Sequence, residues 1–355
     1  MVPRALHLPA RPAGRARLIH LQGLTMGTTW QVKVAISSDH PLEHSPQQLQ
    51  RAIQERLDHV VRQMSSWAHD SDLSRFNRAP AGALVPIPDD LERVMSYALD
   101  VARDSGGACD PTAGALVNAW GFGPGSRFSE PGFTPPTTAA LSAGLASSGW
   151  RRLQWPPLAR HARQPGGLHL DLSAIAKGFG VDQVALVLRQ ARIGDFLVEV
   201  GGELCGAGVK PDGQPWWVAL EDLVEDDGAV QTVVALHGLS IATSGDYRRF
   251  FSSGGCRFSH TIDPRTGWPV SPRVASVTVI HPQCMAADAL STALMVMGPQ
   301  EGIAWADRRG VAALFRLRAE AAAFNGDIGE RTESADGIAE RLTERMTKPF
   351  ADLLQ

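Results

Sequence analysis

The stretch from Asp171 to Asp182 carries the first chemistry that the sequence suggests. Lys177 lies near the expected start of a helix, beside the small residues Ala176 and Gly178. A cation at a helix N-terminus opposes the helix dipole. The free N–H groups of a first helical turn, together with a lysine, would suit an anionic ligand. An exposed lysine on an ordinary surface helix explains this stretch equally well.

A carboxylate and a hydroxyl lie four residues apart in a second segment, at Asp288 and Thr292. Residues at this spacing share one face of a helix. Hard oxygen ligands of this kind suit Mg²⁺, which keeps several waters and shares phosphate oxygens with a substrate. On spacing alone, helix capping by Asp288 is the more common explanation.

His260 is the third candidate, because it lies in the polar, turn-rich segment 259–264. A histidine titrates near neutrality and can act as a general base, although a lone loop histidine is more often simply solvated. Glycine clusters at 106–107, 121–123, 178–180 and 201–202 allow close backbone approach. None of them forms a Walker A loop or a dinucleotide fingerprint, and no G-x-S-x-G nucleophile motif is present.

Composition excludes several classes of protein. The chain has 355 residues, 44% of them hydrophobic, with a net charge of -3. This charge and the absence of a basic run give no reason to expect nucleic-acid binding. The four cysteines are scattered without a CxxC pair, so we expect free thiols. No apolar run has transmembrane length, and residues 1–17 lack the apolar region of a signal peptide. We therefore expect a disordered leader and a cytoplasmic location.

Periodicity predicts helices and strands without regular βαβ alternation. Helices are expected at 45–64, 71–77, 88–105, 138–148, 174–188 (capped by Asp171 or Ser173), 284–298 and 301–309. Strands are expected at 18–22, 29–36, 168–170, 196–200, 216–221, 230–236, 239–244, 274–281 and 311–318, with a surface hairpin at 150–165. This mixture predicts an α+β fold with mixed or antiparallel sheets packed against helices. We place one catalytic domain at 18–329 and a peripheral tail at 330–355.

Several blocks, in one order, resemble the ApbE family of FAD:protein FMN transferases. The resemblance covers most of the chain, from about Met26 to Gly298. Its blocks are Met26–Trp30, Met64–Trp67 with Asp70–Asn77, Asp110–Thr112 with Leu116–Gly123, Asp171–Gly178, Gly201–Glu203, Ser244–Tyr247, Ser259–Gly267, and Ala287–Ala289 with Ser291–Thr292. No single block would be specific, but the ordered set is.

This resemblance implies an ApbE-like (T-fold-like) α+β enzyme that requires Mg²⁺. Such an enzyme splits FAD at its pyrophosphate, transfers FMN to a threonine or serine hydroxyl of an acceptor flavoprotein, and releases AMP. His260 would deprotonate that hydroxyl. The metal would lie between the Ala174 carbonyl, Asp288 and Thr292. The implied FAD contacts are Met26, Trp67, Ala108, Cys109, Asp110, Asp171, Lys177 and Ile262.

The sequence departs from the family at three points. Cys109 stands where many members have an aromatic residue, and Ser291 stands where members often have a second aspartate. The usual lipoprotein or secretory leader is missing, although much of the family is periplasmic or associated with the inner membrane. Two alternatives follow: a protein that binds or stores FAD without transferring it, and an Mg²⁺-dependent FAD pyrophosphatase. The acceptor and the oligomeric state are not encoded in any motif.

Overall fold

The chain folds around one eight-stranded antiparallel sheet, seen in a computed structural model that describes residues 16–37, 45–156, 160–220, 232–318 and 342–354. The strand order is β1-β2-β5-β6-β9-β12-β13-β14. Each neighbouring pair in this order is antiparallel. The strands are β1 (Ala16–Thr25), β2 (Thr28–Ser37), β5 (Phe196–Val200), β6 (Glu203–Ala207), β9 (Leu239–Gly245), β12 (Val274–His281), β13 (Ala312–Arg318) and β14 (Leu342–Met346).

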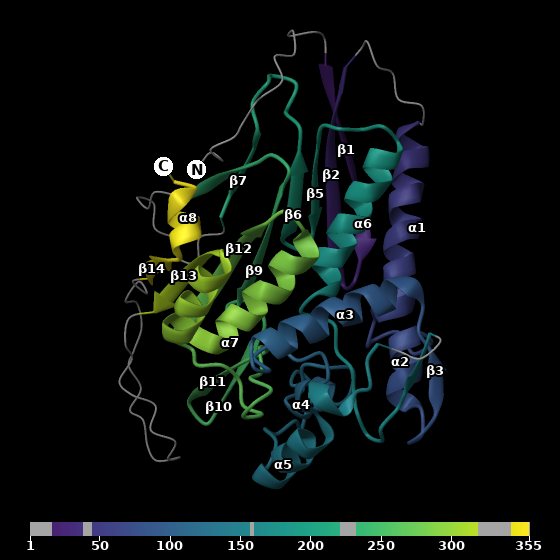
Figure 1. Cartoon of the computed structure of the whole chain (residues 1–355), viewed down its shortest axis with the longest axis vertical. Coiled ribbons are helices and arrows are strands. Elements are labelled where there is room, and N and C mark those ends of the chain that lie inside the picture. The colour runs from purple at the N-terminus through teal and green to yellow at the C-terminus, as the bar shows by residue number, and fades with distance from the viewer. Residues whose placement is uncertain (1–15, 38–44, 157–159, 221–231, 319–341, 355) are drawn as a thin grey trace.

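Helices cover one face of this sheet, as Figure 1 shows. Helix α6 contacts β5 and β6, α7 contacts β9 and β12, and α1 packs beside α6. The helices are α1 (Pro46–Met64), α2 (Asp72–Arg78), α3 (Asp89–Asp104), α4 (Gly114–Ala119), α5 (Thr138–Ser147), α6 (Ala176–Gln190), α7 (Cys284–Arg309) and α8 (Lys348–Asp352), with a 3₁₀ turn at Trp150–Arg152. The prediction of an α+β fold is confirmed.

The opposite face of the sheet is covered by a two-stranded ribbon and a short helix. The ribbon pairs β7 (Trp216–Ala219) with β8 (Val233–Leu236). Alternation along β13 sends Leu314 into the cluster that contains Phe350 of α8, and Phe315 into the cluster beneath the helices. The two faces therefore belong to separate apolar clusters, as the period of a strand requires.

Two smaller ribbons lie outside the large sheet. They pair β10 (Phe250–Ser253) with β11 (Cys256–Ser259), and β3 (Leu84–Pro86) with β4 (His161–Arg163). The expected hairpin at 150–165 is therefore wrong, because β4 finds its partner in β3, far back in the sequence. The expected strand at 168–170 is wrong as well: His169 makes only an isolated bridge to Ala113.

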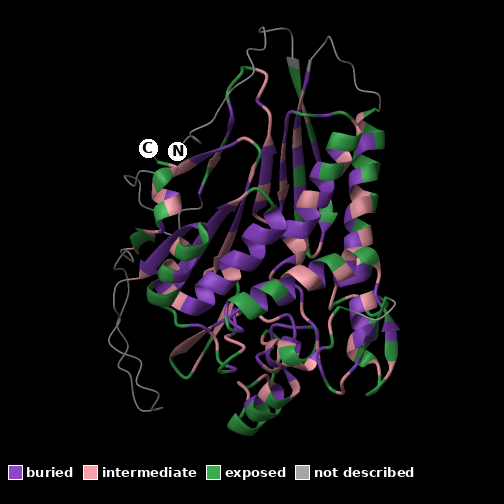
Figure 2. Ribbon diagram, in the orientation of Figure 1, coloured by how far each residue is buried: buried purple, intermediate pink, exposed green. Residues whose placement is uncertain are grey.

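The first half of helix α7 is deeply buried, and Figure 2 shows it in the colour of buried residues while α5 is largely exposed. From Cys284 to Met297, all within the described part of the chain, every residue is buried except Thr292. The backbone leaves helical geometry at Gly298, which has φ 72° and precedes Pro299. This break explains why the sequence predicts two helices there.

The ends of the chain differ from the expected boundaries. Residues 1–15 of the expected leader and 319–341 around the expected tail boundary lie outside the described residues. Arg17 already belongs to β1, and β14 extends the large sheet beyond β13. All four cysteines are free. Across the described ranges, no helix combines the length and the apolar composition that a membrane span needs.

Candidate active site

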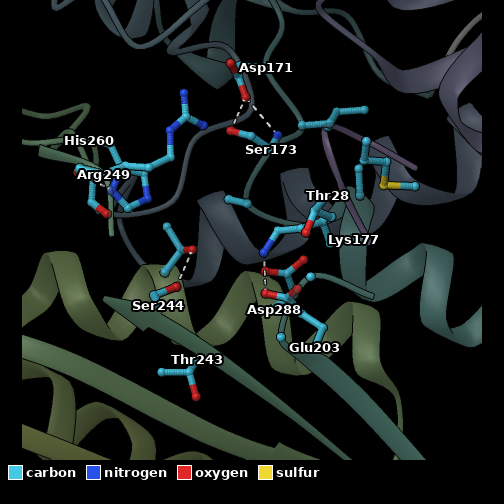
Figure 3. Close-up of a pocket in the computed structure, with 18 of the residues that line it drawn as sticks. Thr28, Asp171, Ser173, Lys177, Glu203, Thr243, Ser244, Arg249, His260 and Asp288 are labelled. Atoms are coloured by element: carbon cyan, nitrogen blue, oxygen red, sulfur yellow. Dashed lines mark hydrogen bonds and ion pairs between the residues drawn. The ribbon is translucent and has the colours of Figure 1, made fainter. Parts of the chain in front are cut away.

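A cavity of about 1180 Å³ opens where the end of α1, the start of α6, the sheet and the β11 region meet. It is lined by residues that are distant in sequence, which Figure 3 shows converging on one space. All twelve residues singled out from the sequence line this cavity: Met26, Trp67, Ala108, Cys109, Asp110, Asp171, Ala174, Lys177, His260, Ile262, Asp288 and Thr292.

The first turn of α6 does not begin as expected. Asp171 Oδ1 accepts hydrogen bonds from the N–H of Ser173, at 2.8 Å, and from its hydroxyl, at 2.5 Å. These bonds close a turn ahead of the helix, which begins at Ala176 without a side-chain cap. The predicted cap by Asp171 or Ser173 is therefore wrong, because Asp171 bonds to Ser173, ahead of the helix, and not to an N–H of the first helical turn.

The N-termini of α6 and α7 are held by each other's carboxylates. Asp182 of α6 accepts from the N–H groups of Cys284 and Met285, both at 2.9 Å. Asp288 of α7 accepts from the N–H of Gly178 through Oδ2, also at 2.9 Å. Gly178 lies in the first turn of α6, where an N–H has no partner within the helix, so the Asp288 carboxylate supplies that partner.

Gly178 permits this approach of the two helices. A Cβ added there would lie 2.4 Å from the Cys284 carbonyl oxygen and 2.8 Å from the Cβ of Asp288. No side chain fits in that space. The glycine that suggested an anion site in the sequence is thus required for helix packing as well.

Lys177, which is partly exposed, forms an ion pair with the buried Glu203 at the start of β6. Figure 3 shows the lysine directed toward Glu203 and Asp288. Burial lowers the pKa of Lys177, but the charges of Glu203 and Asp288 outweigh burial, so the net shift is upward. Burial raises the pKa of Glu203 to about 7, against the opposing effect of Lys177. Burial likewise raises the pKa of Asp288.

One oxygen of this cluster has no partner. Glu203 Oε2 is buried and has no hydrogen-bond partner among the described residues. Glu203 was quoted only as part of a Gly-Gly-Glu block, and sequence reasoning did not identify it as a site residue. The signal was present, because a tight Gly201-Gly202 turn with positive φ at both residues places Glu203 at the start of a buried strand.

Hydroxyl groups from β9 and α7 meet on the other side of Asp288. Ser244 Oγ lies 2.8 Å from Ser291 Oγ and 2.9 Å from Thr292 Oγ1. Ser291 is fully buried, whereas Thr292 is partly exposed to the cavity. Sequence reasoning placed Ser291 near the metal but did not identify Ser244.

The donor set fits a hard divalent cation. Ala174, Asp288 and Thr292 offer a carbonyl, a carboxylate and a hydroxyl, all of them oxygen ligands. No group of three or more His, Cys, Asp or Glu side chains able to hold a metal occurs within the described residues. With a single carboxylate, such a site suits Mg²⁺, which completes its shell with waters and substrate phosphate.

His260 follows β11 and lies beside Arg249, as Figure 3 shows. Its Nδ1 is 3.0 Å from the Arg249 carbonyl oxygen. A carbonyl can only accept, so we assign the ring proton to Nδ1, which leaves the lone pair of Nε2 free. Burial, and then the charge of Arg249, lower the pKa of His260 to about 4. The imidazole is therefore neutral at physiological pH and able to take a proton.

The remaining predicted FAD contacts differ in their exposure and in the hydrogen bonds that they already make. Trp67 is 52% exposed, on a loop whose N–H groups bond to Ser65 Oγ. The carboxylate of Asp110 already accepts from Thr112 and from the Trp150 N–H. Burial raises the pKa of the Cys109 thiol to about 12, so this side chain acts as a small apolar group.

Comparison with known proteins identifies the family of the chain. The ApbE family model matches residues 26–315. A protein of Vibrio cholerae serotype O1 called FAD:protein FMN transferase is 39% identical over 307 residues, which cover 86% of this chain and 89% of that protein. A Klebsiella pneumoniae protein of the same name is 38% identical over 298 residues, 82% of each chain.

Solved structures agree as well. The flavin transferase ApbE from Vibrio cholerae superposes with a TM-score of 0.81 at 35% identity, covering 95% of this chain and 99% of that one. The apo form of the Pseudomonas stutzeri flavinyl transferase ApbE gives a TM-score of 0.80 at 36% identity, covering 95% and 97%. The chain is therefore an enzyme of the transferase class, and it belongs to the ApbE family.

Proposed function

We propose that this enzyme transfers FMN from FAD to a threonine or serine hydroxyl of an acceptor flavoprotein, forming a phosphoester and releasing AMP. The observation that carries the proposal is the convergence on one cavity of a neutral histidine, a lysine held by a buried glutamate, and an oxygen-only donor set. Attack of a hydroxyl on phosphorus needs a base and neutralisation of phosphate charge, and these groups supply both.

His260 is the base in this proposal. Its Nε2 accepts the proton of the acceptor hydroxyl as the oxygen bonds to the phosphorus of the FMN half. The Nδ1–H bond to the Arg249 carbonyl orients the ring and stabilises the charge that it gains. The bond between that phosphorus and the bridging oxygen then breaks, and AMP leaves.

Ala174, Asp288 and Thr292 would hold Mg²⁺ through oxygen atoms. When bound, Mg²⁺ neutralises charge on the pyrophosphate. Lys177 adds a second positive charge in the same part of the cavity and is held there by Glu203. Trp67, Met26 and Ile262 offer the apolar surface that flat rings require, and Asp171 and the segment 108–110 lie along the same wall.

One assay separates this function from FAD storage and from FAD hydrolysis. The purified enzyme is incubated with FAD, Mg²⁺ and a flavoprotein domain that carries a flavinylation threonine, with the Thr→Val form of that domain as control. Covalent flavin fluorescence on the threonine form alone, with AMP released in equal amount, is expected. FMN and AMP in solution without label would indicate a pyrophosphatase, and unchanged FAD would indicate a binding protein.

The metal site is tested with two substitutions of one residue. Asp288→Asn keeps an oxygen that can accept from the Gly178 N–H, whereas Asp288→Ala removes it. We expect both variants to lose Mg²⁺-dependent transfer, and only the alanine variant to lose substantial thermal stability. Full activity in Asp288→Asn would reject the proposed site.

A further inference from the structure

Three hydroxyl groups, those of Ser291, Ser244 and Thr292, form a continuous hydrogen-bonded chain that starts at the backbone carbonyl of Asp288. Ser291 Oγ donates to the backbone carbonyl of Asp288 at 2.9 Å. Ser244 Oγ lies 2.8 Å from Ser291 Oγ and 2.9 Å from Thr292 Oγ1. The chain thus begins at the backbone of Asp288 and ends at the side chain of Thr292.

The direction of each hydrogen bond follows from counting protons. Each hydroxyl has one proton to donate. The proton of Ser291 goes to a carbonyl, which can only accept, so the contact between Ser291 and Ser244 must use the proton of Ser244. The contact between Ser244 and Thr292 must then use the proton of Thr292. Any other assignment leaves two oxygen atoms in contact at under 3 Å with no proton between them.

We propose that Ser291 and Ser244 are positioning residues that fix the Thr292 hydroxyl with its proton toward Ser244 and its lone pairs toward the cavity. The inference rests on the proposed function, since it concerns the cation that Thr292 would bind. A hydroxyl otherwise rotates to suit its surroundings, and a proton turned toward a cation is repelled by it. Outer residues that orient a ligand in this way tune metal affinity.

The burial of Ser291 explains why the orientation of the Thr292 hydroxyl is set by groups inside the protein. Thr292 is the one residue between Cys284 and Met297, a fully described segment, that is not buried, and it lines the cavity together with Asp288. Ser291 is fully buried. By the resemblance described above, Ser291 stands where family members often have an aspartate. In this protein the serine starts the hydroxyl chain and adds no second charge.

The test measures Mn²⁺ binding to the purified enzyme by electron paramagnetic resonance, without FAD or acceptor. Ser291→Ala frees the Ser244 proton to turn toward Thr292, whose own proton then turns into the cavity. We expect Ser291→Ala and Ser244→Ala each to weaken Mn²⁺ binding about tenfold. Ser244→Thr keeps the hydroxyl and should retain the parent affinity.

Thr278→Val is the matched control. Thr278 pairs its hydroxyl with that of Thr243, the residue before Ser244 on β9, at 2.9 Å. This substitution also removes a hydroxyl contact of β9, but no contact of Thr292, so Mn²⁺ affinity should not change. If Ser291→Ala does not fold, Ser291→Cys replaces the hydroxyl with a slightly larger thiol that is a weaker donor, and it should lose part of the affinity.

The outcomes test the role of the hydroxyl chain (Ser291, Ser244 and Thr292) separately from the proposed function. Parent affinity in Ser291→Ala, or absence of Mn²⁺ binding in the parent enzyme, would overturn the proposed role of this chain. Loss of affinity in Thr278→Val equal to that in Ser291→Ala would overturn it too, because a general change of packing would then suffice. If the parent enzyme binds Mn²⁺ and the serine substitutions weaken that binding, but the enzyme transfers no FMN, the proposed function is refuted. The proposed role of the hydroxyl chain then still holds.

Discussion

His260 is neutral over most of the pH range in which proteins are stable. Burial disfavours its charged form, and the neighbouring guanidinium of Arg249 adds to this effect, so its pKa falls to about 4. Only the neutral ring can accept a proton. The active form should therefore persist as pH falls from 8 to 5 and be lost as pH falls through about 4.

The pH dependence of kcat/KM for FMN transfer checks this prediction, because that ratio reports groups of the free enzyme. We expect no loss between pH 8 and 6 that depends on His260. Arg249→Gln removes one cause of the low pKa while keeping the backbone carbonyl that holds Nδ1, so the acid limb should move to higher pH. A limb near pH 6.5 in the parent enzyme would contradict the assigned environment.

Removing the imidazole tests its role directly. His260→Ala should reduce transfer by at least about 10²-fold, the usual contribution of a general base, while FAD affinity stays nearly unchanged. Transfer is followed by covalent flavin fluorescence and FAD binding by fluorescence quenching. His281→Ala, at the end of β12 and not among the residues that line the cavity, serves as control. Equal loss of FAD binding would make His260 a binding or structural residue instead.

At the scale of elements, the site depends on how closely α6 and α7 approach. Gly178→Ala should destabilise the protein by about 1–3 kcal/mol, because its Cβ would lie 2.4 Å from the Cys284 carbonyl oxygen. Helix propensity alone would favour alanine by about 1 kcal/mol, so the sign tests the packing. Urea unfolding measures the change in free energy.

A glycine without neighbours provides the control for that substitution. Gly194 follows α6, and nothing lies within 4 Å of a Cβ added there. Gly194→Ala should leave the free energy of unfolding within about 0.5 kcal/mol of the parent value. Gly178→Ala should also weaken metal-dependent transfer, since the Gly178 N–H holds the Asp288 carboxylate. A stabilised Gly178→Ala variant would show that the helices can separate without cost.

Local patterns in the sequence predicted many of these elements, because their causes are local. Ser45 and Pro46 predicted the start of α1, where Ser45 accepts from the Gln48 N–H. The start of α6 was misplaced by two residues because Asp171 accepts from the N–H and the hydroxyl of Ser173 and closes a turn ahead of the helix, an alternative that helix propensity does not exclude. No comparable side-chain bond competes with the Ser45 cap at the start of α1, so that start was predicted correctly.

Contacts between distant segments could not be predicted from the sequence. The pairing of β4 with β3 and of Lys177 with Glu203 depends on the register of the whole fold. Recognition of several family blocks placed the twelve site residues in one group, and all of them line the cavity. Ser244 was missed as a site residue because its role rests on contacts with α7 that no local pattern encodes, whereas the Gly201-Gly202 turn before Glu203 was a local signal that was not used.

At the scale of the whole molecule, the cavity is assembled from residues between Met26 and Thr292, which include residues of strands β2, β5, β6 and β9 of the large sheet. Leu220 and Ile241 line the cavity and also belong to the apolar cluster on the far face of the sheet. That cluster includes Phe350 of α8. The C-terminal segment therefore packs against the same layer that carries the site, although its polar composition suggested a peripheral tail.

Phe350→Ala tests whether this segment is part of the cooperative unit. Phe350 is 1% exposed, and deletion of a buried phenylalanine side chain costs about 3–5 kcal/mol. We expect urea unfolding, followed by tryptophan fluorescence, to move to lower denaturant as one transition. Leu354→Ala, at a residue that is 49% exposed, should change the free energy of unfolding by less than about 0.5 kcal/mol. An early separate transition in Phe350→Ala, with the main one unmoved, would instead make 342–354 an independent appendage of the sheet.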